Sequence, residues 1–544
     1  MTTAVLFSLL LFVLLHKPLH DLILGYSTQK LDWLHNEEDI FGSRISSQLE
    51  ELDQKWGSRW LVPCGFVLLS CLCYPYLNWQ LLDSGTCIRP FVLSLMGILV
   101  WKYVLTDIDL VTRKTLCKER ILLIFSTIGV YFFPAMMVVF LFTSINYFKG
   151  WLHHNHLPIR MLQCVLTFLI VLGGMGFVAE IGDFGWTITP SESTVTCLVL
   201  LFAVYATHYW IPAAKKVKIS TWKYPWVFHN RLHFIVASAY TWGWLQFLPE
   251  QKVLKLLKYL KKINVPLQLA TLFFEASTLF LLLHPYVASV VIVGIGMMHV
   301  FIFLSTGILF WEYIFTNLLL LSWIHVAGAE LIAALFTWQN ELVFLLLAVV
   351  LPLTHIRLWR PNGLGWWDAP FAGRIHWEVV GESGKVYGLY NDFLDPHERL
   401  FGRIYAWFLT DRKIPYGHLG EVNQVELRNR IVDSKGNKAT LQQIEVTFGK
   451  SHKDIDKEKW HDIYLQKFFQ NFNKGCKKHI LPKGWRFLKP LGGQYYYWGK
   501  EEAFRGQEKV RQVNIFFRSS FYDGEQFLEI SNEWLKTIDI KDDF

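Results

Sequence analysis

Long apolar runs fill roughly the first 355 residues, whereas polar and apolar positions alternate over shorter distances in the rest of the chain. The long runs approach the ~20 apolar residues that a helix needs to cross a bilayer. They occupy residues 61–82, 90–110, 121–145, 161–181, 195–212, 232–248, 266–283, 287–304, 308–326 and 330–352. A shorter run at 4–15 predicts a first transmembrane or re-entrant helix. The pattern therefore predicts a mostly α-helical polytopic membrane protein with about eight to eleven transmembrane helices.

The polar segments divide the chain into three parts. Residues 1–60 combine the first helix with an acidic, polar connector, and residues 61–355 form the polytopic domain. Residues 356–544 contain shorter periodic segments, which predict a soluble α+β domain. Its hairpins are expected at HWEVVGESGKVYGLY, at VELRNRIVDSKGNKATLQQIEVTF and at VNIFFRSSFYDGEQFLEI, each around a glycine-containing turn. Helices are expected near 396–410 and 457–475.

Composition supports the membrane assignment. A hydrophobic content of 52% is too high for an ordinary soluble enzyme. The net charge of +8 comes mostly from lysines and arginines between apolar runs, as expected for membrane loops, so no nucleic-acid partner is predicted. Only Cys476 lies in the C-terminal part, which excludes a disulfide within that domain. The chain is therefore expected to be an integral, multi-pass membrane protein.

Two segments have the composition of a membrane–water interface. In the segment 252–262, lysines recur at helical spacing opposite leucines, which predicts a helix lying flat in the interface. Trp359, Trp366 and Trp367 stand near arginines just after the last apolar run, as in an aromatic belt.

A lysine cluster ends one of the aromatic apolar runs. In YATHYWIPAAKKVKISTW, residues 205–222, Lys215 and Lys216 follow the apolar run directly, and Lys218 comes two residues later. Such amines either reach the headgroups as anchors or, when withdrawn from water, act as bases. Lys218 and Lys223 suit anchoring. Because Lys215 and Lys216 directly follow the segment WIPAA, one of them must point back along the helix wall, and it is a candidate base.

Two polar residues interrupt the apolar segment 273–311. Glu275 lies at the start of one apolar run and His299 lies inside the next. Intramembrane carboxylates and imidazoles are functional candidates by default, although a structural polar pair between two helices is an equal alternative for His299. Gly294, Gly296 and Gly307 allow close helix approach here.

Other histidines are weaker candidates. His153, His154 and His156 have the composition of a metal tract, but no nearby carboxylate or cysteine completes a ligand set, so no metal site is predicted. His208 and His229 flank the lysine cluster, and His229 shares a predicted helix face with His233. These side chains either line the same cavity or are satisfied polar groups beside an aqueous opening.

The segments AAKKVKISTW and FFEAS…HP…GMMHVFIFLSTGILFW resemble the HTTM membrane domain of vitamin K-dependent γ-carboxylases over about residues 205–315. The resemblance implies that Lys216 is the catalytic base and that His299 is the family's intramembrane histidine. Lys215, Glu275, His208 and His229 would support the site or line its cavity. Implied cofactors are a reduced vitamin K-like quinone, with dioxygen and carbon dioxide as co-substrates. Implied partners are membrane lipid, quinone and a peptide or protein substrate.

The implied reaction begins with proton removal from a hydroquinone by an amine at the membrane boundary. Oxygenation to an epoxide yields a strong base, which removes a weakly acidic C–H proton from a peptide glutamate before carbon dioxide adds. His299 would donate a hydrogen bond to an oxygen of an intermediate. The competing hypothesis is a non-enzymatic membrane protein that binds, matures or transports a peptide or lipid, with the lysines serving only as anchors.

Overall fold

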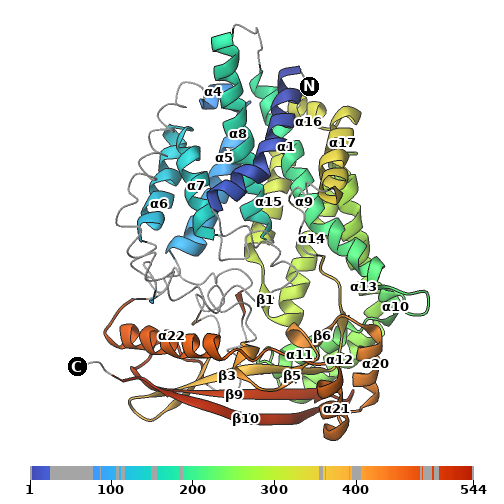
Figure 1. Ribbon diagram of the computed structural model, residues 1–544. Helices are drawn as coiled ribbons and strands as arrows, with labels where there is room; N and C mark the ends of the chain where they lie inside the picture. Colours follow the sequence, from blue (N-terminus) through green and yellow to red (C-terminus); the bar gives the residue numbers. More distant parts are fainter. Residues whose placement is uncertain are drawn as a thin grey trace.

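A bundle of helices forms one end of the molecule, and a mixed domain built on an antiparallel sheet lies beneath it (Figure 1). The computed structural model describes residues 3–24, 77–85, 87–105, 110–111, 117–148, 156–182, 188–354, 359, 361, 363–390, 393–394, 406–477, 481, 493–494 and 502–541. The predicted acidic connector, most of the predicted 61–82 span, His153, His154 and most of the predicted 396–410 helix lie outside these residues.

The described part of the bundle is almost entirely helical. Its α-helices are α1 (Thr3–Leu24), α4 (Trp79–Leu82), α5 (Ile88–Leu99), α6 (Cys117–Phe132), α7 (Met136–Phe148), α8 (Leu157–Gly182), α9 (Pro190–Ile219), α10 (Trp226–His229), α11 (Leu232–Thr241), α12 (Glu250–Lys262), α13 (Asn264–Ser277), α14 (Pro285–Thr306), α15 (Trp311–Val326), α16 (Ala329–Leu335), α17 (Trp338–Leu345) and α18 (Leu351–Leu353). Two π-helices, η2 (Val100–Leu105) and η5 (Leu346–Val350), continue α5 and α17, and the 3-10 turn η4 (Thr278–Phe280) follows α13.

Among the described residues, α8, α9 and α14 are each long and apolar enough to cross a membrane. Two bent pairs, α12 with α13–η4 and α15 with α16, raise this number to five if each pair is one span. The predicted runs 161–181, 195–212 and 287–304 correspond to α8, α9 and α14, so the strongest part of the apolar pattern is confirmed as helix.

Three predicted spans are interrupted. The run 121–145 is two helices, α6 and α7, because Pro134 cannot donate a backbone hydrogen bond within a continuous helix. The run 330–352 breaks after α16, where Thr337 accepts a hydrogen bond from the backbone of Asn340 and so begins α17. The run 232–248 is helical only to Thr241, beyond which Leu245 adopts a positive φ of 61°.

Helix α9 runs through the bundle and ends beside the C-terminal domain (Figure 1). Thr189 and Glu192 form a capping box at its start, with Pro190 in the first turn. The helix continues through Pro212, and Lys216 and Lys218 lie in its last turn, where cations favour the negative end of the helix dipole. All of its most apolar stretch is buried, so α9 is the central helix of the bundle.

The C-terminal domain contains a four-stranded antiparallel sheet in the order β10–β9–β3–β4. Its strands are β3 (Phe371–Gly381), β4 (Val386–Leu389), β9 (Val510–Tyr522) and β10 (Phe527–Asp539). The short pairs β2 (Trp367–Asp368) with β6 (Glu421–Val422), β5 (Lys413–Ile414) with β7 (Lys450–Ser451), and β1 (Ile308–Leu309) with β8 (Gly493–Gln494) are also antiparallel. The first and third predicted hairpins are confirmed as β3–β4 and β9–β10, turning at Gly384 and Gly524 with positive φ.

The second predicted hairpin is wrong. Its two arms are the helices α20 (Val425–Asp433) and α21 (Lys438–Phe448), and the predicted turn instead joins them. Lys435 and Gly436 adopt positive φ, and the Asn437 side chain caps α21. The turn residues were identified correctly, but the apolar positions of α20 recur with the period of a helix. The helix predicted at 457–475 is confirmed as α22 (Ile455–Asn473). Two 3-10 turns, η6 (Trp407–Leu409) and η7 (His418–Gly420), complete the described domain.

Both predicted interface segments pack against protein. The apolar face of α12 is buried through Val253 and Leu257, in a cluster that includes Tyr522 of the C-terminal sheet. This face is therefore not inserted among lipids, although the lysines of α12 are exposed. Trp359 and Trp367 are buried as well, which contradicts their assignment to an aromatic belt.

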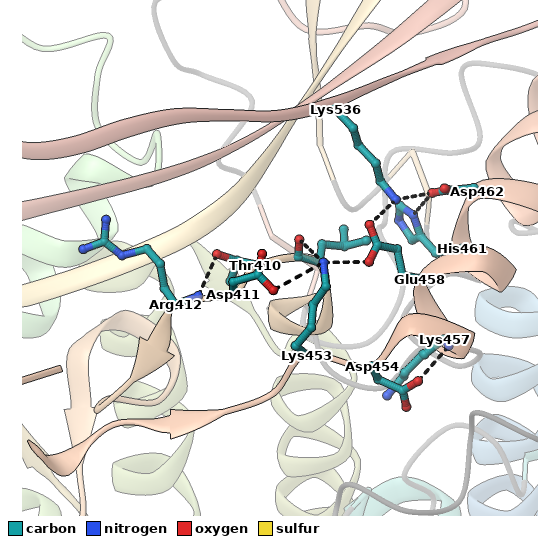
Figure 2. A network of polar contacts seen from close by, with 11 residues as sticks. Thr410, Asp411, Arg412, Lys453, Asp454, Lys457, Glu458, His461, Asp462 and Lys536 are labelled. Carbon is teal, nitrogen blue, oxygen red and sulfur yellow. Dashed lines mark hydrogen bonds and ion pairs between the residues drawn. The ribbon is translucent and has the colours of Figure 1, made fainter. Parts of the chain in front are cut away.

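Helix α22 is held against β10 by a network of charged groups (Figure 2). Lys536 of β10 binds Glu458 at 2.9 Å and Asp462 at 2.6 Å, and Lys453 binds the other oxygen of Glu458 at 2.7 Å. Although burial opposes ionisation, hydrogen bonds from Lys453 and Lys536 hold the pKa of Glu458 below its ordinary value. The pKa of Asp462 is lowered in the same way, against burial, by His461 and Lys536.

We predict that Lys536→Met lowers the melting temperature of the detergent-solubilised protein by a few degrees at neutral pH, because two partly buried carboxylates lose a shared cation. A lowered folded-state pKa stabilises the fold above the unfolded pKa of about 4 and loses this effect as pH falls. The difference from wild type should therefore shrink at about pH 3. Lys459→Met, which removes a largely exposed pair with Asp456, is the control. Equal effects of both variants would contradict the prediction.

A candidate active site at the end of helix α9

Lys216 is the predicted base, and the structure pairs it with Glu275. Its Nζ donates hydrogen bonds to both carboxylate oxygens of Glu275, at 2.6 and 2.7 Å. Lys216 is 8% exposed and Glu275 5%, so the charges meet in a buried ion pair between α9 and α13. Lys218 and Lys223, by contrast, are exposed, as expected for anchors. Lys216 is therefore not positioned as an anchor.

Aromatic residues cover the ion pair. The Lys216 ammonium lies 5.6 Å from the ring centroid of Trp226 in α10, within the range of a cation–π contact. The indole N–H of Trp226 donates to the backbone oxygen of Trp366 at 2.8 Å. The segment that enters the C-terminal domain, residues 363–368 and called the linker below, therefore forms part of the wall around Lys216.

The linker packs directly on Lys215 and Lys216 through two glycines. A Cβ atom on Gly363 would lie 3.0 Å from Cβ of Lys215, and one on Gly365 would lie 2.8 Å from Cγ of Lys215 and 3.2 Å from the backbone nitrogen of Lys216. Side chains at these positions would push the segment away from α9. Lys215, half-buried, is thus a packing surface for the linker rather than a second member of the ion pair.

A group of buried hydrogen bonds holds the linker in place. Asp368 accepts hydrogen bonds from the indole of Trp366 at 3.0 Å and from the amide of Asn230 at 2.9 Å, and its backbone N–H donates to Asn230 at 2.8 Å. The Asn264 side chain in turn donates to the Asn230 backbone and accepts from the backbone of Leu232. Burial raises the pKa of Asp368 to about 7.

His299 lies in an aromatic environment on α14. Its Nε2 is 2.9 Å from the hydroxyl of Tyr209, and the rings of Tyr313 and Phe310 lie 5.1 and 5.7 Å away. Its Nδ1 is buried and has no hydrogen-bond partner among the described residues. Such an atom is available to a ligand or a water molecule.

Lys216 and Tyr209, the residues of α9 that contact Glu275 and His299, lie on one face of the helix. Tyr209 and Lys216 are seven residues apart, about two turns of helix, and therefore point to the same side. Glu275 of α13 and His299 of α14 meet this face. Helices α13 and α14 also contact each other closely, since a Cβ on Gly294 would lie 2.1 Å from the ring of Phe274. Within the described residues, α9 links the two groups, and no hydrogen bond joins Lys216 to His299.

The two remaining predicted residues differ in position. His208 is buried, with its ring 5.4 Å from Tyr209 and 5.6 Å from Tyr313, next to the surroundings of His299. His229 is half-buried and packs edge-on against Tyr224 at 5.3 Å. His229 and His233 belong to the separate helices α10 and α11, so the shared helix face predicted for them is wrong.

Sequence reasoning missed a second buried ion pair. Lys102 of η2 and Glu312 of α15 are fully buried and 2.6 Å apart. The available signal was a lysine inside the apolar run 90–110 and a glutamate inside the run 308–326. The roles of Trp226, Asn230 and Asp368 were also missed, because each depends on a contact between distant segments. Among the described residues, no three histidine, cysteine or acidic side chains lie close enough to hold a metal ion.

Comparison with known proteins adds no further constraint. None of the protein-family models, curated proteins or solved structures compared with the chain matches it. The resemblance noted in the sequence therefore stays a prediction, and the site is interpreted from its own geometry.

We predict that Lys216→Met lowers the melting temperature strongly, because breaking a buried pair costs about 3 kcal/mol and leaves Glu275 unpaired. The double variant Lys216→Met/Glu275→Leu should recover most of the loss, since neither charge then remains. Thermal unfolding in detergent measures both, with Lys218→Met as the exposed control. A double variant no more stable than Lys216→Met would contradict a mutual ion pair.

We predict that Asp368→Asn destabilises the protein by about 1–3 kcal/mol, because its amide N–H₂ would face that of Asn230. A raised folded-state pKa gives stability that is present below the unfolded pKa of about 4 and lost as pH rises through about 7. The variant lacks this dependence, so its defect relative to wild type should be larger at pH 5 than at pH 8. Unfolding at both pH values, with exposed Asp433→Asn as control, provides the test; a defect independent of pH would contradict it.

Proposed function

We propose that this chain is a multi-pass membrane enzyme of the HTTM type, with eight to eleven spans, resembling vitamin K-dependent carboxylases. It would couple oxygenation of a reduced quinone by dioxygen to proton abstraction from a peptide glutamate and its carboxylation. The observation that carries the proposal is the buried Lys216–Glu275 pair, which lies on the same face of α9 as His299, where the bundle meets the C-terminal domain.

A membrane setting explains the surface of the bundle. The most apolar stretch of α14 has a mean hydropathy of 2.5, yet only 33% of it is buried. Val290 and Met297 of this helix are each 62% exposed, and Ile181 of α8 is 69% exposed. Apolar surface on this scale is unfavourable in water and expected against lipid.

The ion pair supplies a base that is protected from water. Transfer of a proton from Lys216 to Glu275, over 2.6 Å, leaves a neutral amine next to the linker wall. In that form Nζ can take a proton from a hydroxyl group placed beside it, and Glu275 keeps the amine oriented through its second oxygen. Trp226 and the linker glycines exclude water from this exchange.

The surroundings of His299 fit the head group of a quinone. The rings of Phe310 and Tyr313 offer flat apolar faces, and the unpaired Nδ1 of His299 offers one hydrogen-bonding atom in a buried setting. Tyr209 fixes the imidazole through Nε2. A reduced quinone would supply, with dioxygen, the strong base that the carboxylation of glutamate requires; His299 would hold one of its oxygens.

The position of the pair lets two kinds of substrate meet. Lys216 is buried, whereas Lys218, two residues further along α9, is exposed, so the site lies within one helical turn of the aqueous boundary. A lipophilic quinone can approach from the bundle and a peptide from the side of the C-terminal domain. In the competing proposal, a non-enzymatic binding or transport protein, the buried pair would join α9 to α13 and the unpaired imidazole nitrogen would hold a ligand.

We predict that purified protein given reduced quinone, dioxygen, labelled bicarbonate and a glutamate peptide converts the quinone to its epoxide and labels the peptide. Lys216→Ala should reduce quinone turnover at least ~100-fold, the usual contribution of a general base, whereas Lys218→Ala should retain it. Epoxide is measured by chromatography and label by scintillation counting.

The outcomes separate the alternatives. Quinone turnover that survives in Lys216→Ala would remove this residue as the base. Quinone turnover without labelled peptide would leave the oxygenation step standing and refute the carboxylation of that peptide. No quinone turnover in the wild-type protein would favour the non-enzymatic class.

A further inference from the structure

Asn317 is a buried amide that the reaction described above does not use. It lies on α15, is 3% exposed, and neither Oδ1 nor Nδ2 has a hydrogen-bond partner among the described residues. A carboxamide has up to four hydrogen bonds to make, and leaving all of them unmade in an apolar setting is unfavourable. A bound ligand or water molecule would satisfy such a group.

A group that binds the Asn317 amide would lie at the contact between α14 and α15. Nδ2 of Asn317 lies 3.6 Å from where a Cβ on Gly296 would be, so the absent side chain of Gly296 leaves room for a group the size of a methyl or an oxygen atom beside the amide. His299 is one turn further along α14, and its ring lies 5.1 Å from Tyr313, one turn before Asn317 on α15. The two helices run antiparallel, so both contacts belong to one face.

Three unpaired hydrogen-bonding atoms therefore border the same helix contact: Oδ1 and Nδ2 of Asn317 and Nδ1 of His299. The His299 imidazole lies among the rings of Tyr209, Phe310 and Tyr313. The amide offers a donor and an acceptor together. It can donate to a carbonyl oxygen and accept from a hydroxyl, which are the two states of the same oxygen in a quinone and a hydroquinone.

We infer that Asn317 is a substrate-binding residue, whose amide and the His299 imidazole together hold an oxygen of the quinone head group in both of its redox states. The inference rests on the proposed function, because it assigns a ligand to the same site. The inference assigns recognition of the head group to Asn317, whereas the proposed base is Lys216.

The test is direct binding, without turnover. A short-chain naphthoquinone and its dithionite-reduced form are titrated, without oxygen, into the full-length protein in detergent, and quenching of tryptophan fluorescence gives Kd. Asn317→Leu should raise Kd for both forms about tenfold or more, while the melting temperature stays the same or rises because an unpaired amide has been removed. Gln163→Leu, which replaces another buried amide on α8, should leave Kd unchanged.

A second ligand separates recognition from packing. 2-Methylnaphthalene has the same ring without oxygens, so Asn317→Leu should leave its Kd unchanged. Loss of affinity for both ligands would mean that the variant disturbs the pocket and would overturn the assignment. An unchanged Kd for the quinone would mean that Asn317 binds only water, and would also overturn it.

The inference and the proposed function fail in different ways. If the wild-type protein binds neither quinone nor hydroquinone, the proposed function fails and the inference falls with it. If quinone binds and is turned over but Asn317→Leu has the wild-type Kd, the inference alone fails.

Discussion

The ion pair between Lys216 and Glu275 is the interaction on which the rest of the site depends. Two charges can remain in an apolar interior only if they meet each other with good geometry and if water is kept from competing for them. The first condition brings α13 against the end of α9. The second requires a cover over that end, which Trp226 and the segment entering the C-terminal domain provide. The pair thus accounts for the arrangement of both the helices and the linker around it.

The linker is part of the site rather than a tether. Gly363 and Gly365 let its backbone approach the lysine pair, and the hydrogen bonds between Asp368 and Asn230 fix where it enters the sheet domain. Because Asp368 is buried and Asn230 stands between α10 and α11, movement of the C-terminal domain relative to the bundle would uncover Lys216. The C-terminal domain therefore also determines how well Lys216 is shielded from water.

The sequence predicted the features that depend on neighbouring residues and missed those that depend on distant ones. Helix α9 and the two glycine-turn hairpins follow from local periodicity, and Lys216 stood out because an amine in an apolar run is expensive. The tryptophans near residue 360 were misassigned, since indole suits both a lipid interface and a domain contact. The segment of α20 and α21 is predicted as strands because its turn residues suit a hairpin as well as a connection between helices. Lys102 and Glu312 are 210 positions apart, and nothing local indicates their pairing.

The length of α9 relates the two halves of the site to a membrane. Its 30 residues extend about 45 Å, more than the ~30 Å of a hydrocarbon core, so its ends reach beyond the apolar layer or the helix is tilted. Tyr209, which contacts His299, lies about 10 Å from Lys216 along this helix. In the proposed reaction, a lipophilic ring would be held near His299, while a peptide approaching from the sheet domain would not have to enter the bundle. For the proposed reaction, a single helix that carries Tyr209 and Lys216 on one face would be sufficient to align a lipophilic and a water-soluble substrate.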